Sequence, residues 1–280
     1  MIFKNKKWLA LAVVALSLIC IFTLLFIYKS TPEKLASEET QKKTDLTNPI
    51  FMRGNGYLSL NKDEVFSISI PYIFGEQNIT NVESVVSDND QALLEFSDTS
   101  GDYVFDENTN VNSFNFDISF KSVGQYVIDK VTIVTSEKTV VVDIGHFIFD
   151  ITDSSDSDLA LFGDTIGIQS SLDNYLLSIK NENKKETLKI TSIYAKTDAL
   201  SLESKEFELA PDGLFSGELS TSISADNPKY SWYVIKPKIE YSVKNAKQFF
   251  LSNATYLGLV DISQHQVDIA LKNKRGSEFK

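Results

Sequence analysis

Closely spaced aspartates near the middle of the chain are the candidate residues for binding a metal ion. They are Asp150, Asp153, Asp156 and Asp158, with Asp164 shortly after them. Hard cations such as calcium are held by several carboxylate and carbonyl oxygens, and these residues could supply them between two domains. The spacing fits no EF-hand loop, which requires glycine at its sixth position and glutamate at its twelfth. The alternative is a solvated linker, and we expect no other cofactor.

Two segments resemble the Asp-Thr-Gly loops that pair carboxylates in aspartic proteases. They are Phe96–Gly101 (FSDTSG) and Phe162–Gly167 (FGDTIG). In a protease, glycine follows threonine directly, so that two aspartates can approach each other and share a proton. Both segments have an extra residue between threonine and glycine. We therefore expect aspartate and glycine in turns here, with no proteolytic site.

The two histidines, His146 and His265, are about 120 residues apart. A zinc site or a Ser-His-Asp arrangement would need two further partners beside one of them. The single cysteine, Cys20, lies in an apolar stretch near the N-terminus. Ordinary structural positions are therefore expected for both histidines, and we predict that the protein is not an enzyme.

Aromatic side chains are the candidates for contact with a glycan. Tyr230, Trp232 and Tyr233 could stack on a sugar ring if they are exposed, as could Tyr72 and Phe74. Alternation along a strand would place Tyr230, Trp232 and Val234 on one face. That face is expected to belong to a hydrophobic core.

A stretch of 21 uncharged, mostly apolar residues, Trp8–Tyr28, is long enough to cross a membrane as a helix. It exceeds the apolar region of a secretory signal, and no small-residue cleavage site stands at its end. We therefore expect a retained signal-anchor, with cleavage as the alternative. Lys4, Lys6 and Lys7 precede it, so the positive-inside rule places residues 1–7 in the cytoplasm. This predicts a single-pass protein of the cell membrane, with an extracytoplasmic ectodomain.

The charge of the chain bears on its partners. The net charge is −11, and residues 30–280 carry 23 basic and 38 acidic side chains. Nucleic acid and anionic lipid are bound through clustered lysine and arginine, so neither is an expected partner. The predicted ectodomain has no cysteine, which suits a bacterial cell surface better than an animal one. We expect a Gram-positive source.

Residues 29–50 are predicted to form a tether. This segment has no aromatic residue, mixes both charges and contains two prolines, a composition typical of a flexible linker. A short helix over Pro32–Lys43 is the alternative.

From Phe51 onward the apolar residues recur with a period of two, which is typical of half-buried strands in antiparallel sheets. The strands expected in a first domain are Val65–Ile70, Ala92–Phe96, Ser113–Phe120, Tyr126–Val134 and Thr139–Phe149. Those expected in a second domain are Thr165–Ser170, Tyr175–Asn181, Thr187–Tyr194, Glu206–Leu209, Leu214–Ile223, Tyr230–Val243, Thr255–Ile262 and Val267–Leu271. A turn or two of helix could form over Ala246–Ser252. The pattern predicts an all-β protein with two tandem immunoglobulin-like β-sandwich domains, at residues 51–152 and 159–273.

The second domain resembles the CARDB-like immunoglobulin domains of bacterial surface proteins. The residues that carry the resemblance are Leu177–Asn181 (LSIKN), Leu188–Ile193 (LKITSI), Phe207–Gly213 (FELAPDG) and Tyr230–Pro237 (YSWYVIKP). In that family an early strand ends in asparagine, and a later Pro-Gly turn leads into the next strand; here Asp212 is inserted into the turn. The resemblance implies display at the cell surface and contact with protein or glycan, and it brings no catalytic residues.

These expectations combine into one functional hypothesis. The chain is predicted to be a membrane-anchored, non-catalytic interaction or scaffold protein that holds a protein partner at the cell surface. The alternative is a module that binds cell-wall glycan or another ligand.

Overall fold

The computed structural model describes residues 48–74, 78–106, 109–153, 157–162, 167–169, 174–202, 206–223, 229–259 and 262–277. These residues belong to one compact unit, residues 46–280. The predicted span 8–28 lies outside them, as do the cytoplasmic segment 1–7 and most of the tether. No helix among the described residues is long and apolar enough to cross a membrane.

The described part of the chain is built of strands with one helix, which confirms the predicted all-β class. The strands are β1 (Ile50–Phe51), β2 (Gly54–Asn61), β3 (Phe66–Phe74), β4 (Val82–Ser87), β5 (Ala92–Asp106), β6 (Thr109–Phe120), β7 (Gly124–Thr135), β8 (Thr139–Thr152), β9 (Leu159–Leu161), β10 (Gly167–Gln169), β11 (Asn174–Asn181), β12 (Leu188–Tyr194), β13 (Leu200–Leu202), β14 (Phe207–Leu209), β15 (Leu214–Ile223), β16 (Trp232–Lys236), β17 (Lys238–Val243), β18 (Ala246–Leu251) and β19 (Thr255–Leu257). The helix is α2 (Gln264–Ser277).

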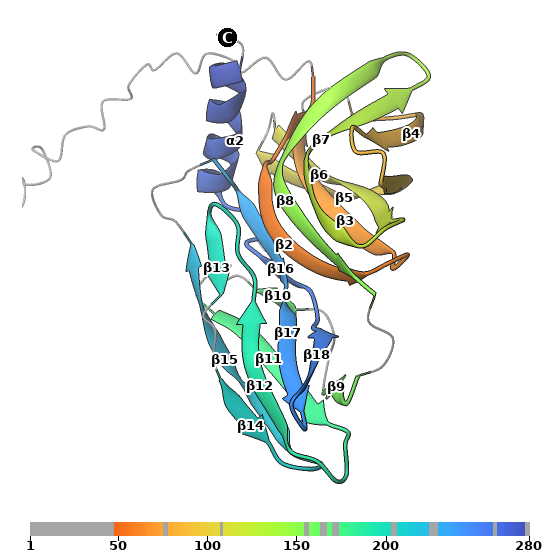
Figure 1. The fold of residues 1–280 in the computed structure, drawn as a ribbon. Helices are drawn as coiled ribbons and strands as arrows, with labels where there is room; N and C mark the ends of the chain where they lie inside the picture. The colour runs from red at the N-terminus through yellow and green to blue at the C-terminus, as the bar shows by residue number, and fades with distance from the viewer. Residues whose placement is uncertain are drawn as a thin grey trace, which may run out of the picture. The chain divides into compact units, whose positions relative to one another are not determined.

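These strands form four sheets (Figure 1). In the first sandwich, a sheet of order β1-β3-β6-β5 packs on a seven-stranded sheet of order β10-β19-β16-β2-β8-β7-β4. In the second sandwich, a sheet of order β13-β15-β11-β9 packs on one of order β14-β12-β17-β18. Both pairs of sheets are β-sandwiches. The division into two tandem domains, at residues 51–152 and 159–273, remains a prediction.

The seven-stranded sheet contains strands from both halves of the chain. Its central strand, β2, pairs in parallel with β8 on one side and with β16 on the other. The core of the first sandwich includes Leu58, Trp232 and Val234 from this sheet. Tyr57 and Tyr233, which point to the opposite face, belong to the core of the second sandwich. Because each face of the sheet contributes to a different core, the two sandwiches are joined through it.

Glycines allow the backbone of β2 to lie close to its neighbours. Gly145 has a φ of 117°, and a Cβ atom on it would lie 1.8 Å from the carbonyl oxygen of Gly54. A Cβ on Gly54 would lie 2.5 Å from the indole ring of Trp232, and one on Gly56 would lie 2.5 Å from Val234. Side chains larger than hydrogen at these positions would separate the strands.

Pro237 divides one predicted strand into two. We predicted a single strand over Tyr230–Val243, but β16 ends at Lys236 and β17 begins at Lys238. The two pieces belong to different sheets. Proline has no backbone N–H to donate to a ladder, which suits a position where the chain leaves one sheet for another.

Two further predictions about secondary structure were wrong. Val267–Leu271, predicted as a strand, lies in α2, which begins with a capping box in which Gln266 Oε1 accepts a hydrogen bond from the Ser263 N–H at 2.8 Å. Val267 and Ala270 are buried at helical spacing against the first core. Ala246–Ser252, a candidate for a helical turn, contains the strand β18, which pairs with β17.

The glycine contacts predict that Gly145→Ala will destabilise the fold severely. The new Cβ would overlap the Gly54 carbonyl, and alanine at this φ is strained, so we expect the free energy of unfolding to fall by about 3 kcal/mol or more. Gly217→Ala is the control, because its Cβ would meet only the side chain of Phe215, at 3.2 Å. Urea unfolding of both variants measures the difference. Equal midpoints would show that strands β2 and β8 can move apart at little cost.

Candidate functional site

A pocket of about 550 Å³ opens at one end of the first sandwich. It lies between β1, the β7–β8 hairpin, the segment before β4 and α2. Its apolar lining residues are Ile50, Phe51, Ile79, Ile133, Val140, Val141, Val142 and Ala270. This volume lies within the range of roughly 300–1,000 Å³ that is typical of ligand-binding pockets. The pocket is therefore the candidate binding site of the described residues.

The hydrophobic face of β8 continues beyond the closed core into this pocket. Val142 and Ile144 are buried in the first core, and Val140, two residues earlier, points to the same side of the strand. Val140 is nevertheless 37% exposed, although it pairs with the buried Ile133 on β7. Val141 is 66% exposed. The end of the hairpin thus presents apolar side chains that the opposite sheet does not cover.

Charged and polar side chains surround the apolar lining. Arg53, Lys138 and Lys274 are basic, and Glu137 and Asp143 are acidic. The Nε of Arg53 donates to Asp143 Oδ1 at 3.0 Å, and both groups are partly exposed. The surroundings of the pocket therefore carry one net positive charge, in a chain whose net charge is −11.

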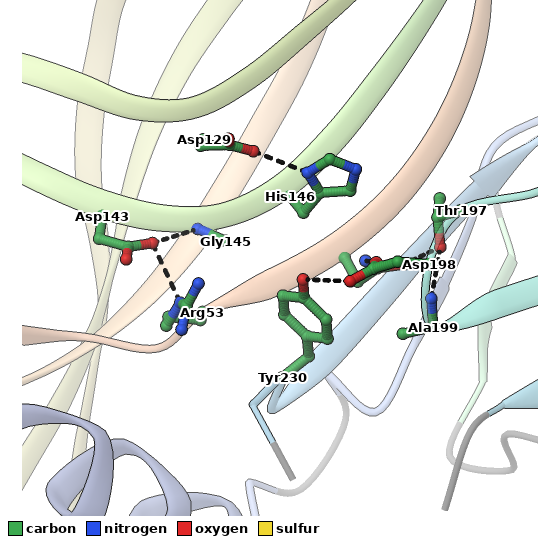
Figure 2. A network of polar contacts seen from close by, with 10 residues as sticks. Arg53, Asp129, Asp143, Gly145, His146, Thr197, Asp198, Ala199 and Tyr230 are labelled. Carbon is green, nitrogen blue, oxygen red and sulfur yellow. Dashed lines mark hydrogen bonds and ion pairs between the residues drawn. The ribbon is translucent and has the colours of Figure 1, made fainter. Parts of the chain in front are cut away.

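Arg53 also joins the pocket to a polar network between the two sandwiches (Figure 2). Its guanidinium carbon lies 5.6 Å from the centroid of the Tyr230 ring. The Tyr230 hydroxyl donates to Asp198 Oδ2 at 3.0 Å, and Asn55 Nδ2 donates to Asp198 Oδ1 at 2.8 Å. Asn55, which is fully buried on β2, also accepts a hydrogen bond from the Thr197 hydroxyl. These bonds tie the loop before β13 to the shared sheet.

The network affects the ionisation of two tyrosines. Burial raises the pKa of Tyr230 to about 12, and the hydrogen bond and negative charge of Asp198 add to this rise. The hydrogen bond from Asn55 and the positive charge of Arg53 act in the opposite direction. Burial also raises the pKa of Tyr233 to about 12. Both hydroxyls are therefore neutral at physiological pH.

Asp150, a predicted calcium ligand, takes part in a second polar contact between the sandwiches. Its Oδ2 accepts hydrogen bonds from the Tyr57 hydroxyl at 2.6 Å and from Lys238 Nζ at 2.7 Å. Burial raises the pKa of Tyr57, and the hydrogen bond to Asp150 adds to the rise. The ammonium group of Lys238 thus already neutralises Asp150, so this carboxylate is poorly placed to ligate calcium.

Of the other predicted calcium ligands, only Asp153 and Asp158 are among the described residues. Asp158 Oδ1 accepts a hydrogen bond from Asn183 Nδ2 at 3.2 Å. Asp153 lies just after β8, while Asp156 and Asp164 lie outside the described residues. Within the described ranges, no group of three His, Cys, Asp or Glu side chains is arranged to hold a metal ion. Calcium at this junction remains a prediction that these contacts do not support.

The aromatic residues considered for glycan contact lie in the interior. Trp232 is fully buried, and its Nε1 donates to the Met52 carbonyl at 3.1 Å. Tyr230 and Tyr233 are 6% and 5% exposed, while Tyr72 and Phe74 are likewise buried. Tyr230 packs in the second core and Trp232 in the first, so the expected common face does not form. None of these rings offers an exposed surface to a sugar.

The histidines and the aspartate-threonine segments occupy unrelated places. His146 Nδ1 lies 2.8 Å from Asp129 Oδ1 at a bulge between β7 and β8 (Figure 2), and His265 is exposed on α2. Asp98 lies in β5, where its carboxylate accepts a hydrogen bond from Asn115, rather than in the predicted turn. Most of the segment Phe162–Gly167 lies outside the described residues.

Two of the four motifs that carry the resemblance, Leu177–Asn181 and Phe207–Gly213, contact each other. The side-chain amide of Asn181, at the end of β11, donates to the carbonyls of Leu209 and Ala210 at 3.1 and 2.9 Å. The Asn181 N–H donates to the Gly213 carbonyl at 2.9 Å. The asparagine thus holds the Pro-Asp-Gly turn, in which Asp212 has a φ of 56°. This is a local structural role.

Comparison with known proteins gives no family. No family model matches the chain, and no curated protein matches it. Among solved structures, a protein of unknown function from Porphyromonas gingivalis W83 is 12% identical, with a TM-score of 0.23 over 71% of this chain and 93% of that chain. The D0-D1 domain of Intimin is 15% identical, with a TM-score of 0.21 over 75% of this chain and 97% of that one. CBD12 from CALX1.2 is 10% identical, with a TM-score of 0.20 over 83% of this chain and 87% of that one.

TM-scores this low carry no argument about function. The resemblance to CARDB-like domains therefore remains a prediction from the sequence. The pocket and the polar network were not predicted from the sequence, because their residues come from segments that are far apart in the chain.

The raised tyrosine pKa values predict a loss of stability at alkaline pH. The pKa of Tyr230 is about 12 in the folded protein, against 10.0 as its ordinary value. The folded state therefore retains more protons than the unfolded state between these values, and the free energy of unfolding falls as the pH rises through them. Urea unfolding at a series of pH values measures this slope. In Tyr230→Phe we expect the free energy of unfolding to fall less steeply with pH, by the equivalent of up to one bound proton. An unchanged slope would contradict the raised pKa of Tyr230.

Proposed function

We propose that the protein is a membrane-anchored, extracytoplasmic and non-catalytic interaction module that holds a protein partner at a bacterial cell surface. The predicted signal-anchor and the acidic, cysteine-free ectodomain support its location. The observation that carries the proposed contact with a protein is an exposed apolar patch on the second sandwich. We call Phe162, Leu176 and Leu214 the outer patch.

Leu176 and Leu214 share the solvent face of the sheet that contains β9, β11 and β15, and Phe162 directly follows β9. Leu176 and Leu214 are 58% and 49% exposed, and Phe162 is 54% exposed. They surround Ser178 and Ser216, which face each other across β11 and β15 with their hydroxyls 2.8 Å apart. The Phe162 N–H donates to the Ser178 carbonyl at 3.1 Å, so the backbone of Phe162 lies beside β11 at this pair.

Such an arrangement favours a protein partner over a glycan. Grouped apolar side chains on an otherwise polar surface are typical of protein–protein contact, whereas single exposed ones are common on any surface. The serines between them are small, so a partner can approach the sheet closely. The aromatic rings that would favour glycan binding are buried.

The outer patch can be removed without disturbing the sheet. Leu176 pairs with Glu218 and Leu214 pairs with Lys180 across the strands. In the double variant Leu176→Lys, Leu214→Glu, each new charge faces an opposite charge, so we expect a stable fold and an unchanged net charge. Loss of two leucines that a partner would cover should weaken partner binding by roughly 10- to 100-fold.

Crosslinking and affinity purification of the full-length protein from its native membrane measure this loss. The control is Val86→Lys, Val127→Glu, which changes two exposed valines on β4 and β7 in the same way. A stoichiometric protein that is recovered with wild type and control but lost from the patch variant supports the proposal. Equal recovery with all three would place the contact elsewhere, and recovery of wall polymer alone would favour the glycan-binding module.

A further inference from the structure

We propose that the pocket at the end of the first sandwich binds the acyl chain of a membrane lipid. The inference rests on the proposed membrane anchoring and adds a second ligand to the proposed protein partner. Three features carry it: the apolar lining of the pocket, its place beside the start of the described chain, and the bonding of its polar side chains.

The lining suits an unbranched apolar chain. Phe51, Ile79, Ile133 and Val140 line the pocket together with Ala270 of α2, and none of these side chains carries a polar group. The volume of about 550 Å³ is sufficient for a ligand rather than a few water molecules. Val140 and the neighbouring Val141 are exposed to water in the described structure. A bound acyl chain would remove this apolar surface from water, which is favourable.

The pocket is close in sequence to the predicted membrane span. Asn48, the first described residue, lines the pocket. Residues 29–47, which separate it from the predicted span ending at Tyr28, amount to 19 positions. If these residues form the tether predicted from the sequence, its reach would be roughly 25 Å. Under the proposed anchoring, a segment of 19 residues links the pocket to a membrane, which can supply lipid as an apolar ligand.

The polar side chains of the pocket favour an acyl chain over a peptide. Asn48 Oδ1 accepts a hydrogen bond from Lys138 at 3.2 Å, and Asn273 Nδ2 donates to the Lys229 carbonyl at 3.0 Å. Asn78 Oδ1 accepts hydrogen bonds from Tyr72 and from the Ile79 N–H. A bound peptide would need hydrogen-bond partners for its own backbone N–H and C=O groups. The asparagine atoms named above already have partners within the protein. An acyl chain makes no such demand.

Photocrosslinking of the full chain in lipid nanodiscs tests the inference. The discs consist of phosphatidylcholine with a small fraction of phosphatidylcholine that carries a diazirine at the end of one acyl chain. After irradiation, mass spectrometry identifies the labelled residues. We expect labels at residues 133–142 and 264–274 as well as within 8–28. Labels confined to 8–28 would leave the anchoring intact and overturn the pocket inference, whereas a lack of label within 8–28 would contradict the anchoring itself.

Substitutions within the pocket distinguish a bound chain from passing contact. Val140→Glu introduces a charge into the apolar lining and should reduce labelling of residues 133–142 and 264–274 at least 10-fold, with labelling of 8–28 unchanged. Val140→Gln, which adds a polar group without a charge at the same position, is a second variant in case the first folds poorly. Val86→Glu, on β4 and away from the lining, is the matched control and should label as wild type does. Equal labelling in all variants would overturn the inference.

Discussion

The close approach of β2 to its two parallel neighbours is the constraint on which the rest of the structure depends. At Gly54 the backbone meets Gly145 of β8 on one side and the indole of Trp232 on the other. Parallel neighbours require long connections, and here the connections to β8 and β16 contain most of the first and second sandwiches respectively. One short glycine-containing strand therefore determines that both sandwiches share a sheet.

Since β2 is buried on both faces, its alternate side chains serve different cores. Leu58 and Leu60 pack in the first core, and Tyr57 packs in the second. Asn55, on the same face as Tyr57, reaches the loop that contains Asp198, while the Tyr57 hydroxyl reaches Asp150 beside Lys238. Buried polar groups need such partners, so the contacts between the sandwiches are specific in position as well as apolar. These contacts would hold the surfaces of the two sandwiches in a fixed orientation to each other.

Strands with one buried and one exposed face could be predicted from the alternation of apolar and polar residues. Strands whose burial depends on segments far away in the chain could not. Ser113–Phe120 was predicted because one side faces the core and the other faces solvent, and it lies within β6. No strand was predicted at β2, because two glycines and burial on both faces remove the alternation. The helix α2 was missed although Ser263 and Gln266 form a capping box and Val267, Ala270 and Leu271 have helical spacing. That signal was present in the sequence.

The pocket and the outer patch differ in how far the sequence could have predicted them. Leu176 and Leu214 occupy the solvent positions of strands whose alternation was evident, so an apolar residue at each was visible before the structure. Their place on one face of a single sheet depends on the pairing of β11 with β15, which a single sequence does not specify. The pocket requires β1, the β7–β8 hairpin and α2 to meet, and one of these was predicted with the wrong secondary structure. A site on one face of a sheet can thus be predicted once the periodicity and the strand register are known. To predict a pocket between several elements, the complete topology is needed.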